Sequence, residues 1–229
     1  MTITYHRDLV QGSEEWHAAR CGLITASEVK LLLSPKTLQP LNNEKTRAHI
    51  WELAAQRITK YVEPTYISDD MLRGHEDEIR ACDLYRKHFG PVEACGFVTN
   101  DEWGFTIGCS PDRLVGDDGL IEAKSRRQKF QVQTIVEHFR EGVIPEEHRL
   151  QVQTNLLVTG RMWCDFISYS GGLPTRPLRI EADLAVQDAI VAACIEAERQ
   201  IAEAVTDFRK AVRQGFIPTE RVIEQEMFV

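Results

Sequence analysis

The most constraining feature of the sequence is the segment IGCSPDRLVGDDGLIEAKS, residues 107 to 125. Short runs with β-branched residues stand on either side of GDDG, a cluster of turn-forming residues. The Asp118–Gly119 pair favours a tight hairpin turn, because glycine adopts positive φ without steric cost and aspartate tolerates it better than most residues. The segment therefore predicts an antiparallel β-hairpin.

Three ionic side chains should meet on this hairpin. Side chains alternate between the two faces of a strand, so Glu122 and Lys124 project from the same face. The intervening Ala123 and the preceding Ile121 point to the opposite face. Counted back from the turn, Asp112 falls close to the level of Glu122 and Lys124, so two acids and a lysine should converge at one end of a sheet.

Such convergence predicts a metal site. Carboxylates within a few ångströms of each other repel, which raises the pKa of at least one unless a cation lies between them. An all-oxygen ligand set favours Mg²⁺ or Mn²⁺ over zinc. Beside such an ion, Lys124 can orient an attacking water and offset the charge that develops on a phosphate. A solvated hairpin with a surface Glu/Lys pair is the alternative, and the spacing alone leaves it open.

The rest of the chain predicts an α/β protein with a central mixed sheet flanked by helices. Ser13 is a candidate N-cap, Thr25 and Glu28 stand at capping-box spacing, and Ser68 can cap a helix that ends before Gly90. Short strands in VEACGFVTN, FTIGCS, RLVG and LIEAKS should form an antiparallel meander, and MWCDFISYS should add another strand. We expect the longer helices at residues 44 to 59, 68 to 89, 128 to 140, 146 to 159 and 182 to 214.

Composition limits the classes of protein that remain. With 229 residues, 43% of them hydrophobic, the chain can bury one core, so we expect a single domain over residues 1–229. The six cysteines are scattered without zinc-finger spacing and should be reduced core thiols. No apolar window is long enough for a membrane span, and the N-terminus lacks a secretory pattern, so we expect a cytoplasmic protein with no membrane partner.

The charge balance bears on nucleic-acid binding. Thirty-five acids against 27 Lys and Arg give a net charge of -8, which argues against a protein that coats nucleic acid by bulk electrostatics. KSRRQK, residues 124 to 129, is nevertheless a local basic patch directly after the acidic pair. A solvated charged turn is the alternative interpretation of this patch.

Four blocks of the sequence together resemble a known family. SPD followed by IEAK is similar to the PD-(D/E)xK nuclease motif, and the wider pattern resembles the lambda-type (YqaJ-like) viral alkaline exonucleases. WHAARCGLITASEV is similar to that family's N-terminal segment, RGHEDEIRA to its G-x-x-x-E helix, and LQVQTNLLVTG to its Q-V-Q helix. The blocks occur in the family's order between about residues 16 and 160, and the resemblance implies a restriction-endonuclease-like core.

The resemblance implies catalytic roles for particular residues. Asp112 and Glu122, aided by the backbone carbonyl of Ala123, would hold Mg²⁺, with two ions expected and Mn²⁺ a plausible substitute. Glu78 would support the second ion, and its choice over Glu76 follows the family's spacing from the preceding glycine.

Two further residues would act on the substrate. The resemblance implies that Lys124 positions the nucleophilic water and that Gln151 contacts the scissile phosphate or that water. A glutamine on a helix is otherwise more often a surface residue.

The resemblance also implies a 5′-phosphate site. Arg20 and Ser27 match positions that bind the 5′-phosphate in the family, and Ser110 would add a hydrogen bond. Arginine suits phosphate oxygens, and Ser27 is expected in the first turn of a helix, where free N–H groups favour an anion. An ordinary surface arginine and a capping serine are the alternatives, and we interpret Trp16 mainly as core packing.

DNA contacts outside the reaction centre are expected at a few more positions. Arg126 and Arg127 of the basic patch would bind DNA. Arg113 replaces a glycine that is frequent in the family and could contact the DNA backbone or brace the loop. The family's strand-separating wedge maps to Met71 and Leu72, for which burial in helix packing is the alternative.

The predicted function is a Mg²⁺-dependent 5′-to-3′ exonuclease. It would degrade one strand of linear double-stranded DNA from a 5′-phosphorylated end and leave a 3′ overhang for phage-type recombination. The resemblance further implies a ring-shaped homotrimer that encircles DNA and a single-strand annealing recombinase as partner. A restriction- or repair-type endonuclease of the same fold and a non-catalytic DNA-binding scaffold are the alternatives. A glycosidase also uses two carboxylates, but it has no need of a lysine at this position.

Overall fold

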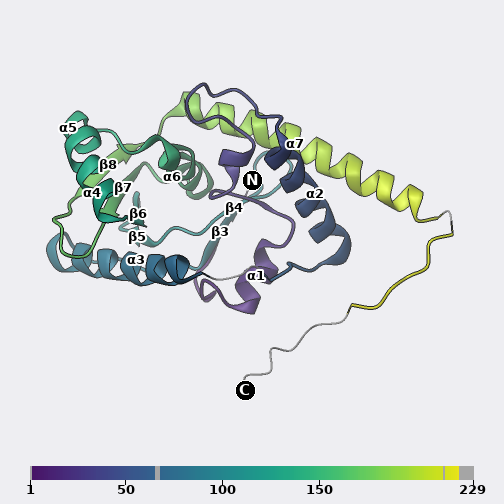
Figure 1. Ribbon diagram of the computed structural model, residues 1–229, viewed down its shortest axis with the longest axis horizontal. Helices are drawn as coiled ribbons and strands as arrows, with labels where there is room; N and C mark the ends of the chain where they lie inside the picture. The colour runs from purple at the N-terminus through teal and green to yellow at the C-terminus, as the bar shows by residue number, and fades with distance from the viewer. Residues whose placement is uncertain (1, 65–67, 214, 222–229) are drawn as a thin grey trace, which may run out of the picture.

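The protein is described by a computed structural model that covers residues 2–64, 68–213 and 215–221 (Figure 1). Its strands form two four-stranded mixed sheets. The first has the order β1-β3-β4-β2 and the second the order β5-β6-β7-β8. The strands are β1 (Ile3–His6), β2 (Ile24–Thr25), β3 (Phe97–Asn100), β4 (Ile107–Cys109), β5 (Arg113–Val115), β6 (Gly119–Ser125), β7 (Trp163–Tyr169) and β8 (Pro177–Glu181).

Helices surround both sheets. The α-helices are α1 (Glu14–Arg20), α2 (Glu44–Thr59), α3 (Asp69–His88), α4 (Gln128–Gln133), α5 (Phe139–Glu141), α6 (Glu146–Thr159) and α7 (Leu184–Ala211). A short 3₁₀ helix, η1 (Val29–Leu31), follows β2, and a π-helical turn, η2 (Thr134–His138), joins α4 to α5. The long helix α7 runs past α2 and continues beyond the body of the fold (Figure 1).

The sheet that carries β6 is covered on both faces. Leu120 of β6 faces the main core, which includes Leu150 and Leu156 of α6. Ile121 and Ala123 face the opposite way and pack against α3 in a second apolar cluster. The predicted alternation of β6 is therefore confirmed, and it places Glu122 and Lys124 on the side of α6.

The predicted hairpin exists, but its turn differs from the prediction. Strands β5 and β6 pair antiparallel, with Val115 opposite Gly119. The positive φ, +51°, falls on Gly116 and not on Gly119. A Cβ on Gly119 would lie 2.1 Å from ring atoms of Trp163, so this glycine is required by a close approach of β7. The buried Arg161 closes the turn by donating to the carbonyls of Gly116 and Gly119.

Other local expectations hold in part. Ser13, Ser68 and the bounds of α6 agree with the prediction. The meander is wrong because β4 and β5 belong to different sheets, and the edge strands β1 and β8 were not predicted. Helix α7 ends at Ala211, before the predicted end at residue 214, which lies outside the described residues.

The capping box predicted at Thr25 and Glu28 does not start a helix. Thr25 is the last residue of β2, and its hydroxyl donates to the carboxylate of Glu28 at 2.6 Å instead of starting a helix. Ser27 therefore lies in a turn and not in the first turn of a helix as expected. The three-residue η1 that follows is too short to offer the row of free N–H groups that the prediction required.

Cysteine chemistry agrees with the prediction. All six thiols are free, and five of them are buried. In the described parts of the chain, no helix combines the length and apolar character needed to cross a membrane.

Candidate active site

The hairpin brings Asp112 level with Glu122, as predicted. The residue after Asp112 in β5, Arg113, stands opposite Ile121. The backbone N–H of Ala123 donates to Oδ2 of Asp112 at 2.6 Å, and the N–H of Asp112 donates to the carbonyl of Ile121 at 3.2 Å. Two hydrogen bonds therefore fix Asp112 against the middle of β6.

Glu122 is the most buried of the site's acids, with 1% of its surface exposed. Its Oε1 accepts from Nζ of Lys124 and from Nε2 of Gln151, each at 2.6 Å. Its Oε2 accepts from Nδ2 of Asn155 at 2.7 Å. Three donors on two oxygens offset the cost of removing an ionised carboxylate from water.

Helix α3 contributes a third acid. Oε1 of Glu78 lies 3.9 Å from Nζ of Lys124. Its neighbours are used elsewhere: Glu76 is exposed and pairs with Arg80, and buried Asp77 accepts from the hydroxyl of Ser125. Of the three carboxylates in HEDE, the structure thus brings Glu78 to the site.

The electrostatics of the three acids favour a cation. Burial, followed by the charge of Glu122, raises the pKa of Asp112 well above its usual range. Burial also raises the pKa of Glu78 to about 6, although Lys124 opposes the shift. Burial lowers the pKa of Lys124, but the surrounding carboxylates outweigh it and leave that pKa raised. One ammonium therefore faces three carboxyl groups, and burial raises the pKa of two of them, Asp112 and Glu78.

The donor set fits a hard divalent ion. Asp112, Glu122 and Glu78 offer carboxylate oxygens, and a backbone carbonyl at Ala123 would add another, which is the ligand chemistry of Mg²⁺ or Mn²⁺. Within the described ranges, no three His, Cys, Asp or Glu side chains already stand at positions that could hold an ion. Oε1 of Glu122 already accepts from two donors, so ion binding through Oε1 would require Lys124 or Gln151 to move.

A second polar cluster surrounds Arg20 at the end of α1. Its guanidinium stacks 4.2 Å from the centre of the Trp16 ring and donates to the hydroxyls of Thr25, at 3.1 Å, and Ser110, at 3.5 Å. Ser27 lies beside Thr25, with their hydroxyl oxygens 3.4 Å apart. In the part of the chain described, no carboxylate forms a salt bridge with Arg20, and burial lowers its pKa. We call these five residues the arginine pocket.

The arginine pocket adjoins the acids through a short link. Ser110 accepts from Arg20, and Asp112 follows it after one proline. Trp16 donates its indole N–H to Ser110 and to the carbonyl of Gly96, each at 3.0 Å. Trp16, which was interpreted mainly as core packing, is half-buried, and its indole N–H also orders the pocket.

The two arginines of the basic patch are already paired with acids. Arg126 bonds Glu147 and contacts the ring of His148, while exposed Arg127 bonds Asp70 at 2.8 Å. Arg113 donates to the carbonyl of Asp112, which supports the bracing alternative for this residue. Phosphate contacts by Arg126 or Arg127 would require exchange of these carboxylates.

Met71 and Leu72 are exposed by 54% and 55% in the first turn of α3. The alternative that they are buried in helix packing is therefore wrong. Both residues follow Asp70, whose carboxylate forms the salt bridge with Arg127.

Sequence reasoning did not identify Asn155. Its spacing from Gln151, four residues along α6, was the available signal, because residues at i and i+4 lie on one face of a helix. Thr25 was considered for a capping role and not for the arginine pocket.

Fold and site together define a protein of the restriction-endonuclease-like fold, with mixed sheets between helices and an acidic site on a β-hairpin. The family model of the YqaJ-like viral recombinase domain matches residues 15–162, and the chain belongs to that family. No curated protein sequence matches the chain.

Solved structures agree with this membership. An alkaline exonuclease from Laribacter hongkongensis, LHK-Exo, is 33% identical and superposes with a TM-score of 0.76 over 89% of this chain and 100% of its own. The same exonuclease in complex with dAMP gives 33% identity and a TM-score of 0.75, with the same coverage of both chains. A phage-related exonuclease from Haemophilus somnus 129PT, 12% identical with a TM-score of 0.58, covers 81% of this chain and 96% of its own and shares the fold.

Proposed function

We propose that the protein is a metal-dependent exonuclease that degrades one strand of linear duplex DNA from a 5′-phosphorylated end. The observation that carries the proposal is the direct link between the arginine pocket and the acids through Ser110 and Asp112. A pocket that prefers a terminal phosphate, set next to a phosphodiester-cleaving centre, would select chain ends as substrate. LHK-Exo, which is 33% identical to this chain, is an alkaline exonuclease, and this similarity supports an exonuclease.

Asp112, Glu122 and Glu78, with the carbonyl of Ala123, would hold Mg²⁺, with two ions expected and Mn²⁺ as a substitute. When bound, the ion supplies Lewis-acid polarisation of the phosphate and makes water a better nucleophile at neutral pH.

The remaining groups of the site have complementary roles. The ammonium of Lys124 would position the water and offset charge on the phosphate, and the amide of Gln151 would donate to the scissile phosphate or the water. Both groups now contact Oε1 of Glu122, so they stand beside a proposed metal ligand.

The direction of degradation would follow from the arginine pocket. Arg20 can donate two parallel hydrogen bonds to phosphate oxygens, and the hydroxyls of Ser27 and Ser110 can add others. A hydroxyl-terminated strand would lose these charge-assisted contacts. Degradation would then proceed from 5′ to 3′ and leave a 3′ overhang suited to recombination by a single-strand annealing partner.

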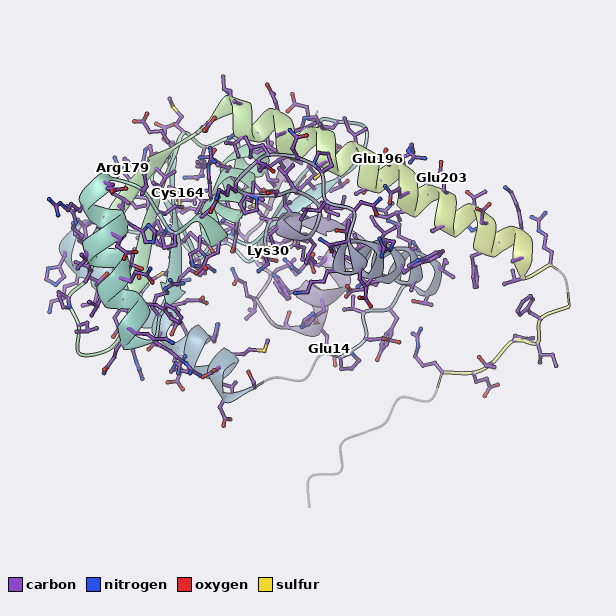
Figure 2. All side chains as sticks on the ribbon, turned by 45° about the horizontal axis from the view of Figure 1, so that its top comes forward. Glu14, Lys30, Cys164, Arg179, Glu196 and Glu203 are labelled. Atoms are coloured by element: carbon purple, nitrogen blue, oxygen red, sulfur yellow. The ribbon has the colours of Figure 1, made fainter. Side chains whose placement is uncertain are left out.

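Handling of the duplex calls for surfaces beyond the acids. The exposed Met71 and Leu72 suit a wedge that unstacks the terminal base pair, and Arg126 and Arg127 would contact the DNA backbone. A ring-shaped homotrimer would let three local basic linings face one channel while acidic surfaces face outward. Glu196 and Glu203, on the solvent side of α7, are examples of such outward acids (Figure 2).

The test uses duplex DNA labelled at either end, together with covalently closed circular DNA. With Mg²⁺, we expect early release of the 5′ label, later release of the 3′ label and no cutting of the circle. Cutting of the circle at the rate of linear DNA would indicate an endonuclease of the same fold. Binding without release of nucleotides would indicate a DNA-binding scaffold.

A further inference from the structure

Two neutral amides from successive turns of α6 hold the Glu122 carboxylate. Gln151 donates to Oε1 at 2.6 Å, and Asn155, four residues later, donates to Oε2 at 2.7 Å. Asn155 is 1% exposed, so no water competes for this hydrogen bond. The family resemblance gives Gln151 a role at the scissile phosphate, but it gives none to Asn155.

The two oxygens of Glu122 are not held equally. Oε1 accepts from both Lys124 and Gln151, whereas Asn155 is the donor to Oε2 in the described chain. Loss of Gln151 would leave Lys124 on Oε1. Loss of Asn155 would remove the donor of Oε2 and leave the carboxylate held through Oε1 alone.

The other end of the Asn155 amide indicates why asparagine occupies this position. Its Oδ1 is buried and finds no hydrogen-bond partner among the described residues. A leucine of similar shape would avoid this unsatisfied acceptor. The amino group is therefore the useful part of the side chain, and its visible use is the bond to Glu122.

A neutral donor also suits the charges around Glu122. Asp112 and Glu78 lie nearby, and the proposed ion would be held by this acidic set. A second lysine or arginine at position 155 would orient the carboxylate but would also compete with the ion for it. An amide orients it without adding charge.

We propose that Asn155 is a positioning residue that holds Oε2 of Glu122 and so presets the carboxylate for a divalent ion. The inference rests on the proposed metal-dependent function. Groups that orient metal ligands typically contribute about 10- to 100-fold to metal affinity or activity. Asn155 should act through Glu122 and not through DNA.

The test compares Asn155→Leu with Thr154→Val, a control at the adjacent buried position. The Thr154 hydroxyl donates to the carbonyl of Leu150 within α6, and no hydrogen bond joins it to Glu122 in the described structure. Mn²⁺ binding is measured by calorimetry without DNA, and thermal stability is measured without metal. Asn155→Leu should weaken Mn²⁺ binding about 10-fold or more and lower the melting temperature, because it leaves Oε2 of the buried Glu122 without its donor. Thr154→Val should bind Mn²⁺ like the wild type.

Activity gives a second readout. Asn155→Leu should lower kcat at limiting Mn²⁺ with an unchanged KM for DNA, and higher Mn²⁺ should restore kcat. If Asn155→Leu does not fold, Asn155→Ser is used, since its shorter side chain cannot reach Glu122. Wild-type Mn²⁺ affinity in the folded variant would overturn the inference while leaving the proposed function intact. Absence of Mn²⁺ binding by the wild-type protein would overturn both.

Discussion

Replacing Arg20 tests whether the arginine pocket recognises a terminal phosphate. Arg20 stacks on Trp16 and donates to Thr25 and Ser110 without a carboxylate salt bridge in the described structure. Its guanidinium is thus positioned but not neutralised. Hydrogen bonds to a charged group contribute about 1.5–3 kcal/mol. At about 1.4 kcal/mol per factor of ten, Arg20→Ala should reduce the preference for 5′-phosphate over 5′-hydroxyl ends by about 10- to 100-fold.

The assay measures kcat/KM for two duplexes that differ only in the 5′ end group. Arg20→Lys keeps the charge but loses the planar fork, so its preference should fall between those of the wild type and Arg20→Ala. Arg199→Ala is the matched control, because Arg199 lies on α7 and pairs with Glu196 and Glu203. An unchanged end preference in Arg20→Ala would refute the role of the pocket, even if the overall rate fell.

Three further predictions concern the reaction centre, acid stability and DNA affinity. Asp112→Ala and Lys124→Ala should each abolish Mg²⁺-dependent nucleotide release while circular dichroism shows an intact fold; full activity in either would contradict the proposed site. Burial and the charge of Lys124 lower the pKa of His148 from 6.5 to about 3, so His148 stays neutral in the folded protein but protonates on unfolding. This contribution to stability is present above about pH 6.5 and is lost as the pH falls toward 3, by up to about 1.4 kcal/mol per pH unit. His148→Gln should therefore flatten the acid limb of stability measured by urea unfolding, and an unchanged slope would contradict the burial argument. Asp70→Asn should free Arg127 and raise DNA affinity at low salt more than Asp83→Asn, which makes the same charge change at the Arg86 pair on α3. Equal effects in fluorescence anisotropy would show that only bulk charge matters.

Local signals account for what the sequence could predict. Ser13 and Ser68 accept hydrogen bonds from backbone N–H groups three residues ahead, which is a relation within one turn of chain. The prediction that Asp112 lies level with Glu122 followed from strand alternation across a short hairpin. These features depend on neighbours in sequence, so residue order alone was sufficient.

The errors arose where distant segments decide the structure. Position 119 requires glycine because the ring of Trp163 leaves no room for a Cβ, whereas Gly116 is required by its positive φ. No local rule distinguishes these two reasons for a glycine. The edge strand β1 pairs with β3, nearly a hundred residues away, with Ile3 opposite Asn100. Asn155 resembles any polar helix residue until α6 is placed against β6.

The two polar clusters of the site carry opposite charges: the arginine pocket is cationic, and the cluster around Glu122 is acidic. Arg20 carries a positive charge among hydroxyls, with the charge of Glu28 acting on it but no salt bridge in the described structure, whereas Asp112, Glu122 and Glu78 surround one ammonium. A terminal phosphate would satisfy the first cluster, and a divalent cation would satisfy the second. Because Ser110 and Asp112 connect the clusters, a DNA end with its metal ions would bring both charges to the place where each is favoured. The net charge of -8 therefore does not conflict with a DNA substrate, since recognition would depend on these local charges and not on the sum.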